Sequence, residues 1–313
     1  MARVFVSGEA LVDFVPAETA SGERAFVPKP GGSPFNVAKA AAKAGADTEF
    51  VGVLSTDFLG DMLRDDLEAS GAGTAMAERS DRPASLAFVD LSTGSPRYAF
   101  HFEGTADEDM NPGIDAAPEP GDILHVGSIS LVGPAASRIT AFAEREGARR
   151  MLSLDPNVRD TLIKNRTKWH GRIDRLTKAA TILKLSDEDL AFMRPDAKPE
   201  SFAADMLRRG PKLVVVTGGA EGALAMTASG HAQVKAPEIE LVDAVGAGDT
   251  LMGSMLAWLV AESIDAPDKV AAMDDERLTE LLRFATTAAA INCTRAGCVP
   301  PTRAEVEAFL LAK

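Results

Sequence analysis

The chain has 313 residues, of which 46% are hydrophobic and 25% are charged. These proportions are those of a globular protein with one large core, and they exclude disordered, collagen-like and disulfide-scaffold chains. The formal net charge of −13 repels phosphate backbones and anionic lipid, so nucleic acid is not an expected partner. A bound anion must therefore be held by local backbone N–H groups and a few placed cations.

The sequence gives no sign of export or membrane insertion. The longest apolar stretch, 251–261, is shorter than the roughly 18 residues that a membrane span needs. The N-terminal segment contains Glu9 and Asp13 and has no export signal. Cys293 and Cys298 are the two cysteines, too few for a metal cluster. We therefore expect a cytoplasmic protein with free thiols and no membrane contact.

Short apolar runs alternate with Ala-rich segments of helical period along most of the chain. The periodicity predicts strands near 4, at 50–54, near 123, and at 151–155, 181–186 and 212–219, and helices at 36–44, 61–68, 135–146 and 169–178. Several strands are continuous apolar runs, which is typical of strands covered on both faces. The order predicts a mostly parallel sheet with helices on both sides. Beyond about residue 243 the pattern is almost wholly helical.

Two segments, 23–29 and 84–102, have a strand-like pattern with no helix between their parts. The second contains a predicted turn at 92–96, so we expect a hairpin and an extra strand that form a small sheet. Such a sheet is a candidate lid. The predicted boundaries are 15–30 and 84–105 for the β-lid, and 1–14, 31–83 and 106–313 for the α/β catalytic domain. An exposed lid edge can pair with a second subunit, so a homodimer through the lid is one expectation, although no residue demands it.

The segment 243–253, DAVGAGDTLMG, is the most informative one. Gly246, Ala247 and Gly248 leave backbone N–H groups free to surround an anion where a loop enters a helix. Asp249 follows in the first helical turn. An acid beside an anion site is expected where it takes a proton from an attacking hydroxyl while the N–H groups stabilise a transferred phosphoryl group. The alternative is that Asp249 is only a helix-start acid. A Walker A loop and a complete G-x-G-x-x-G fingerprint are both absent from the sequence.

Two other segments combine polar groups with a predicted loop. The glycines in 31–36 allow a ligand to approach closely and Asn36 can hydrogen-bond a hydroxyl, although a turn with a helix cap explains the segment equally well. Asp155, Asn157 and Arg159 follow a buried strand, where open α/β sheets place ligands. The alternative there is a solvated loop with ordinary surface salt bridges.

Two remaining segments carry weaker signals. Thr217, Gly219 and Gly222 follow a strand and permit a nucleobase or a phosphate to approach, but such glycines are usually turn formers. The acidic run 186–189 can attract a hydrated Mg²⁺. A helix cap followed by acids in the first turn is the simpler interpretation of that run.

In this order and spacing, these segments resemble the ribokinase-like carbohydrate kinases over essentially the whole chain. GGSPFNVAKAAAKAGA (31–46) is similar to the N-terminal signature of that family, and DAVGAGDTLMGSML (243–256) is similar to its C-terminal signature. Shorter stretches resemble the bacterial fructokinase branch most closely: GEALVDF (8–14), FEGTAD (102–107), HVGSISL (125–131), DPNVR (155–159) and KLSDEDL (184–190).

The resemblance implies a Rossmann-like three-layer α/β/α fold of the ribokinase-like type with a small β-sheet lid. Sugar binds under the lid, and ATP lies along the C-terminal glycine segments with Mg²⁺. Carried onto this sequence, Asp249 is the general base, and the remaining roles are an anion hole at Gly246, Ala247 and Gly248, sugar contacts at Asp13, Gly32, Asn36, Phe100, Phe102 and Arg159, and ATP contacts at Lys184, Thr217, Gly219, Gly222, Gly246 and Gly248.

The implied reaction is transfer of the ATP γ-phosphoryl group to fructose, at the 6-position. Kinases of another small sugar or sugar acid, such as tagatose or 2-keto-3-deoxygluconate, or of a nucleoside remain open, because they share the phosphate chemistry. Outside the enzymes, a non-catalytic sugar-binding sensor also remains open, although such a protein would not need Asp249. The expected partners are a small-molecule sugar and ATP.

The chain departs from the wider family in three places. Ser186 and Asp189 stand where relatives carry an Asn and a Glu linked to Mg²⁺, so the metal ligands stay unknown, with Asp189 a candidate through water. Ala244 replaces the usual Thr. The loop 297–301 looks shortened where relatives place carbonyls around a monovalent cation, so a role for K⁺ stays open.

Overall fold

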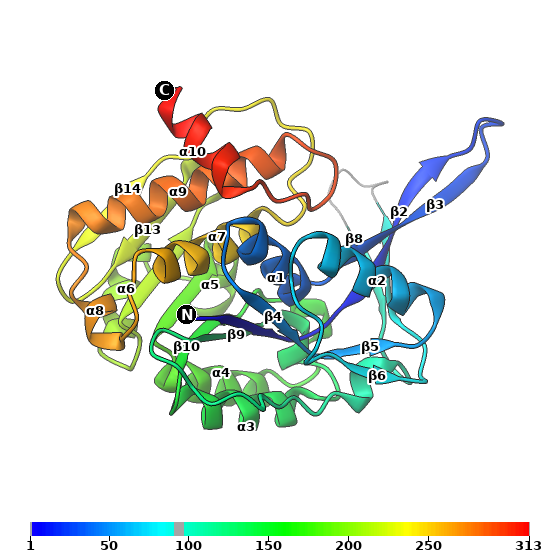
Figure 1. The fold of residues 1–313 in the computed structure, drawn as a ribbon, viewed down its shortest axis with the longest axis horizontal. Coiled ribbons are helices and arrows are strands. Elements are labelled where there is room, and N and C mark those ends of the chain that lie inside the picture. The colour runs from blue at the N-terminus through cyan, green and yellow to red at the C-terminus, as the bar shows by residue number, and fades with distance from the viewer. Residues whose placement is uncertain (1, 91–96, 313) are drawn as a thin grey trace.

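The computed structural model describes residues 2–90 and 97–312, and the predicted turn at 92–96 lies outside them. The main sheet contains β1 (Val4–Ser7), β4 (Thr48–Val51), β9 (Ile123–Gly127), β10 (Met151–Asp155), β11 (Ile182–Ser186), β12 (Leu213–Thr217), β13 (Ala223–Met226) and β14 (His231–Val234). Over these ranges its order is β14-β13-β12-β11-β10-β9-β1-β4 (Figure 1).

Six neighbouring strands of the main sheet pair in parallel over the described residues, as predicted: β4, β1, β9, β10, β11 and β12. β13 and β14 continue the sheet antiparallel. The sequence pattern did not predict these two short strands, because ALAM and HAQV carry neither a β-branched run nor a clear alternation.

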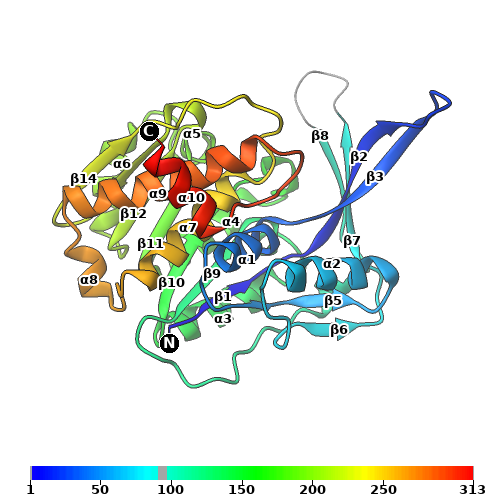
Figure 2. The ribbon, with the colours of Figure 1, turned by 45° about the horizontal axis from the view of Figure 1, so that its top comes forward.

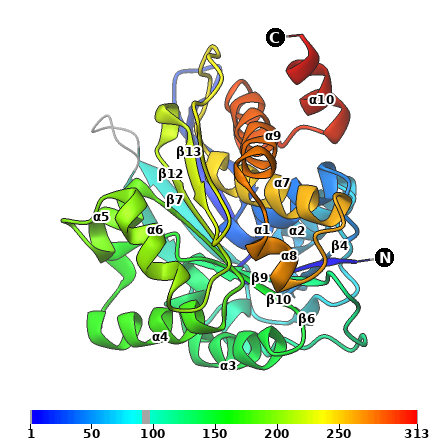
Figure 3. The ribbon, with the colours of Figure 1, turned by 90° about the vertical axis from the view of Figure 1, so that its left-hand side faces the viewer.

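Helices cover both faces of this sheet, which gives the predicted three layers (Figure 3). One side carries α1 (Ser33–Lys43), α2 (Phe58–Ala69), α7 (Ala247–Ala261), α8 (Pro267–Ala271), α9 (Asp275–Cys293) and α10 (Arg303–Leu311). The other side carries α3 (Ala136–Gly147), α4 (Arg166–Ala179), α5 (Asp187–Met193) and α6 (Pro199–Leu207). Short 3-10 turns are η1 (Ala106–Asp109), η2 (Ser128–Leu131), η3 (Asp160–Leu162) and η4 (Gly219–Glu221).

The strands are buried on both faces because their alternate side chains enter two different cores. On β12, Val215 packs into the core with α7 and α9, whereas Val214 packs into the core with α3, α4 and α6. Both valines are fully buried. This placement explains why the sequence shows continuous apolar runs instead of an alternation of apolar and polar residues.

A second sheet stands off the main one (Figure 2). It contains β2 (Leu11–Glu18), β3 (Arg24–Gly31), β7 (Ser85–Asp90) and β8 (Arg97–His101), in the order β3-β2-β7-β8 for the ranges that the structure covers. β2 begins at Leu11, so the stretch 11–14, which the sequence analysis assigned to the catalytic domain, is part of this small sheet. Residues 8–10 alone separate β2 from the core strand β1.

The single strand predicted at 50–54 is wrong. The structure has two strands there, since β4 ends at Val51 and β5 (Val53–Ser55) pairs with β6 (Glu78–Ser80) in a separate small sheet. Gly52 lies at the break, and a Cβ at this position would lie 2.5 Å from an aromatic carbon of Phe50. The close approach of the Phe50 ring therefore explains why a residue without a side chain stands where the chain changes sheets.

Within 2–90 and 97–312, none of the helices has both the length and the apolar character that crossing a bilayer requires.

Candidate active site

A cavity of about 650 Å³ lies between the small sheet and the main domain. Its floor is at the carboxyl ends of β11 and β12, where open α/β sheets place ligands. The small sheet contributes Asp13, Tyr98 and Phe100, and the starts of α1 and α7 close another side. Two sheets and two helix starts therefore converge on one space large enough for a sugar and part of a nucleotide.

Asp249 is the central acid of this cavity. It lies in the first turn of α7, only 8% exposed. Its Oδ1 accepts a hydrogen bond from Ser33 Oγ at 2.7 Å and its Oδ2 accepts one from Asn36 Nδ2 at 2.9 Å. Burial raises the pKa of Asp249 above its ordinary value, while the bonds from Asn36 and Ser33 act in the opposite direction. Since α1 fixes both oxygens, the carboxylate does more than begin its own helix.

Beside Asp249, the residues 246–248 have the predicted close-packed backbone. Gly246 is the N-cap of α7 with φ 72°, a left-handed conformation that favours glycine. A Cβ on Gly246 would lie 2.3 Å from Cys298 Sγ, and a Cβ on Gly248 would lie 3.2 Å from Lys184 Nζ. The first N–H groups of a helix have no partner within the helix. Here the Ala247 N–H donates to the Ala244 carbonyl at 3.2 Å, outside the helix. The amides of Gly248 and Asp249 at the start of α7 then lie next to a lysine ammonium, which suits an anion.

Lys184 forms a buried ion pair with Asp155. The Nζ to Oδ2 distance is 2.8 Å, and the two side chains are 4% and 1% exposed. Burial opposes the charge of Lys184, but attraction and a hydrogen bond from Asp155 raise its pKa above the ordinary value. The alternative of an ordinary surface salt bridge at Asp155 is therefore wrong. The pair places the Lys184 ammonium beside Gly248, at the end of the cavity formed by the start of α7.

The opposite end of the cavity carries Asp13 and Arg159. Burial and the charge of Asp249 raise the pKa of Asp13 to about 6, and Arg159 acts against that rise. Arg159 Nη1 donates to Asn157 Oδ1 at 2.7 Å, and Asn157 Nδ2 donates to Ser33 Oγ at 2.8 Å. A chain of hydrogen bonds thus connects Arg159 to the serine that holds Asp249.

Most of the residues predicted for the site line this one cavity: Asp13, Gly32, Asn36, Phe100, Arg159, Lys184, Thr217, Gly219, Gly246, Ala247, Gly248 and Asp249. Three predicted residues do not. Gly222 has φ 90°, and a Cβ there would lie 1.9 Å from the carbonyl oxygen of Val234, so it is a turn former. Asp189 Oδ2 accepts from the N–H of Ser186 in a capping box, and its Oδ1 accepts from another backbone N–H. The helix-cap interpretation of 186–189 is the one that these contacts support.

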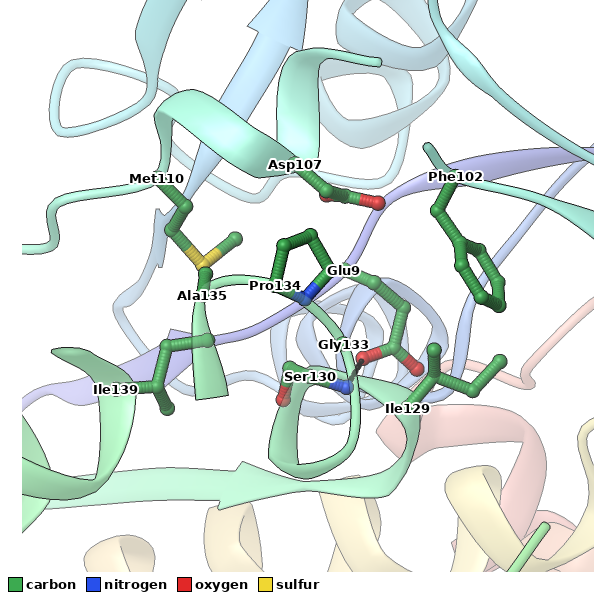
Figure 4. A pocket seen from close by; sticks show the side chains of 10 residues that line it. All are labelled: Glu9, Phe102, Asp107, Met110, Ile129, Ser130, Gly133, Pro134, Ala135 and Ile139. Atoms are coloured by element: carbon green, nitrogen blue, oxygen red, sulfur yellow. Dashed lines mark hydrogen bonds between the residues drawn. The ribbon is translucent and has the colours of Figure 1, made fainter. Parts of the chain in front are cut away.

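Phe102 is the third, and it lines a neighbouring cavity of about 10 Å³, room for about one water. Figure 4 shows this space between Glu9 and Asp107. Glu9 accepts hydrogen bonds from the N–H of Ser130 at 2.9 Å and of Ser33 at 3.3 Å. Burial raises the pKa of Glu9 to about 7 and the pKa of Asp107 to about 6. Glu9 therefore anchors the start of α1, from which Ser33 reaches Asp249.

Sequence reasoning missed Ser33 and Tyr98 as cavity residues, whereas Asn157 was one of the polar groups expected at the carboxyl end of a strand. Ser33 stands inside the glycine motif, a segment already singled out. Tyr98 had no comparable signal, because its position depends on how the small sheet folds over the cavity.

The described residues do not include a group of three or more His, Cys, Asp and Glu side chains that would hold a metal ion. Near the loop 297–301, the carbonyl oxygen of Cys298 accepts a hydrogen bond from Lys39 Nζ at 3.2 Å, and that of Val245 accepts one from Asn292 Nδ2 at 2.9 Å. A carbonyl oxygen has two lone pairs, so these bonds leave the role of K⁺ open.

Comparison with known proteins adds a family to this geometry. The sequence profile described as pfkB family carbohydrate kinase matches residues 1–305. The fructokinase of Rhizobium leguminosarum bv. trifolii is 38% identical over 279 residues, 88% of this chain and 85% of the relative. The fructokinase of Xylella fastidiosa with bound ATP superposes with a TM-score of 0.86 and 27% identity, covering 99% of this chain and 98% of that one. A double mutant of the fructokinase of Vibrio cholerae O395, with fructose, ADP and a potassium ion bound, has a TM-score of 0.83 at 27% identity and covers 99% and 98%.

Proposed function

The chain belongs to the pfkB family of carbohydrate kinases, and we propose that it transfers the γ-phosphoryl group of ATP to D-fructose, with the 6-hydroxyl as acceptor. The family shows the class of reaction. The relatives named fructokinase support the choice of fructose. The cavity supports both, because it has an acid-lined end under the small sheet and an amide-lined end at α7.

Asp249 is the proposed general base. The sugar hydroxyl loses its proton to Asp249 while its oxygen bonds to the γ-phosphorus, and the bond from that phosphorus to the bridging oxygen of ADP breaks in line. The raised pKa of Asp249 brings the carboxylate closer to the pKa that suits a proton acceptor at neutral pH. Ser33 and Asn36 fix its two oxygens, so little reorganisation is needed at the moment of transfer.

The phosphate end stabilises the charge of the phosphoryl group. Residues 246–248 and Lys184 line the same space. We assign Thr217 and Gly219 to the nucleotide, since both line this end. Mg²⁺, when bound, neutralises charge on the phosphate oxygens, and it takes few protein ligands in sites of this kind. The carboxylates of Asp187 and Glu188 line the cavity and suit contact with it through water.

The sugar end positions the acceptor. Asp13 offers a hydrogen-bond acceptor, while Gly32 lets the sugar approach the backbone and Arg159 offers donors. Phe100, from β8, supplies an apolar cover from the small sheet, which we propose acts as a lid that keeps water from the phosphoryl group.

One observation carries this proposal: a buried carboxylate, fixed by two side chains of α1, lies between the sugar-facing residues and the open amides of α7. The test is ADP release with a panel of fructose, tagatose, glucose, 2-keto-3-deoxygluconate and adenosine, followed by NMR of the product. We expect the highest kcat/KM with fructose and the phosphate on the 6-hydroxyl. Preference for another acceptor would reassign the substrate. Sugar binding without ADP release for any of them would make the protein a sensor.

We also propose a homodimer formed through the lid. Phe26 and Val27 on β3, an edge strand of the small sheet, are 48% and 41% exposed, and an exposed apolar edge favours pairing. Light scattering after size exclusion should give twice the 32.9 kDa chain mass, and Phe26→Ser should shift it toward the monomer. A cytoplasmic location is in keeping with the two free cysteines.

A further inference from the structure

A loop from the C-terminal part of the chain lies directly behind the phosphate end of the cavity. Residues 294–299 follow α9, and Cys298 packs on Gly246 so closely that a Cβ on the glycine would lie 2.3 Å from Sγ. Gly246 immediately precedes the amides of 247–249. Any movement of Cys298 therefore changes the backbone that is aimed at the phosphoryl group.

Two side chains, Asn292 and Asp243, join this loop to the phosphate loop 243–248. Asn292, fully buried, donates from Nδ2 to the Val245 carbonyl at 2.9 Å and accepts from the Val299 N–H at 2.8 Å. Asp243 accepts from the Val245 N–H at 3.0 Å and from the Gly297 N–H at 2.8 Å. The two loops are thus one hydrogen-bonded unit, and whatever holds 294–299 also holds the phosphate loop.

Lys39 holds this unit from the other side. It lies on α1, three residues beyond Asn36, and is 7% exposed. Its Nζ donates to the Cys298 carbonyl at 3.2 Å and lies 2.6 Å from Asp66 Oδ2 on α2. A buried ammonium is costly unless it is paired and hydrogen-bonded. Here it has both kinds of partner, and one of them is the backbone behind the phosphate site.

We propose that Lys39 is a positioning residue for phosphoryl transfer. Its ammonium orders the loop 294–299 and, through the bonds of Asn292 and Asp243, the phosphate loop 243–248. The proposal rests on the proposed kinase function.

The first test is kinetic. Lys39→Met should lower kcat about tenfold while the KM for sugar stays within about twofold, because the acceptor end is untouched. Lys39→Ala should regain part of its kcat on addition of methylammonium, which can enter the vacated space. Lys43→Met, on the same helix, removes an equal charge and should leave all constants unchanged.

The second test does not require turnover. Amide hydrogen exchange in Lys39→Met should become at least fivefold faster in peptides covering 243–249 and 294–299, and stay unchanged in the strands of the main sheet. If Lys39→Met folds poorly, the same exchange measurement is made on Lys39→Met/Asp66→Asn, which removes both members of the ion pair. The exchange pattern does not depend on the sugar, so it is expected even if fructose proves not to be the substrate. A wild-type kcat in Lys39→Met, or exchange that rises equally throughout the chain, would overturn the proposal.

Discussion

The two ends of the active-site cavity are built from opposite chemistry. The phosphate end has open amides at the start of α7 and one ammonium, Lys184, which Asp155 keeps charged. The acceptor end has Asp249 and Asp13, whose pKa values are raised because burial disfavours their charged forms. A chain with a net charge of −13 thus binds a polyanion through local groups. The buried acids of the acceptor end lower the folding stability, and one of them, Asp249, is the proposed proton acceptor.

The largest expected effect is that of removing the carboxylate of Asp249, the proposed base. Asp249→Asn keeps the shape of the acceptor end but cannot take a proton, so kcat should fall roughly 10²–10⁴-fold with KM values within a few-fold. Steady-state kinetics for both substrates measure this. Near-normal turnover would remove Asp249 from the mechanism.

At the phosphate end, Lys184→Met should act on stability as well as on function. It leaves the Asp155 carboxylate buried without its partner, which should lower the free energy of unfolding by about 3–5 kcal/mol. Urea denaturation measures the loss. Adding Asp155→Asn should restore most of the stability but not the KM for ATP. If the double variant regained both, the ammonium would have only a structural role.

Glu9 tests how much the buried acids near the acceptor end lower the free energy of unfolding. Its pKa is about 7 in the folded state, against 4.5 as the ordinary value, so between these pH values the folded protein keeps a proton that the unfolded chain releases. The free energy of unfolding should therefore fall as pH rises from about 4.5 to 7, by up to about 3 kcal/mol from this residue.

Glu9→Gln should flatten that pH dependence. Urea denaturation of both proteins at pH 5 and pH 7.5 measures it. Asp13 and Asp107, each with a pKa of about 6, act in the same direction, so part of the slope should remain in the variant. An identical slope in the two proteins would show that Glu9 is not the acid that titrates.

Arg159→Ala should have the smallest effect of the four. It removes a donor from the acceptor end and leaves the amides of α7 untouched, so the KM for sugar should rise about tenfold, with the KM for ATP unchanged. Lys164→Ala is a matched control, because Lys164 is 89% exposed. An unchanged KM for sugar would place Arg159 outside the acceptor site.

The sequence revealed the layers and the phosphate loop, because both depend on local pattern. Continuous apolar runs predicted buried strands, and the glycines before Asp249 predicted a helix start open to an anion. The contacts of Ser33 with Asp249 span 216 positions, and no local pattern contains such a distance. The pairing of Asp155 with Lys184 depends on the register of β10 and β11. Within the sequence, this ion pair is indicated locally by a lysine, Lys184, in the otherwise apolar run TILKL.

The breaks in regular structure were the hardest to predict. FVGVL has the composition of one strand, but contact with the Phe50 ring at Gly52 sends its two halves into different sheets. Likewise, β2 begins inside a stretch that the sequence pattern assigned to the main domain. Both outcomes are set by tertiary packing, which overrides propensity in short segments.

The short connection between β1 and β2 bears on the hydrolysis of ATP by water when no sugar is bound. Residues 8–10 carry the chain from the core into the small sheet, and Gly31 and Gly32 carry it back to the helix that grips the base. If the small sheet moves onto a bound sugar, as we propose, the movement also reaches the start of α1, which holds Asp249. A water molecule is too small to contact both the small sheet and the start of α1. We therefore expect water to be a poor acceptor of the phosphoryl group, and ATP hydrolysis without sugar to be slow.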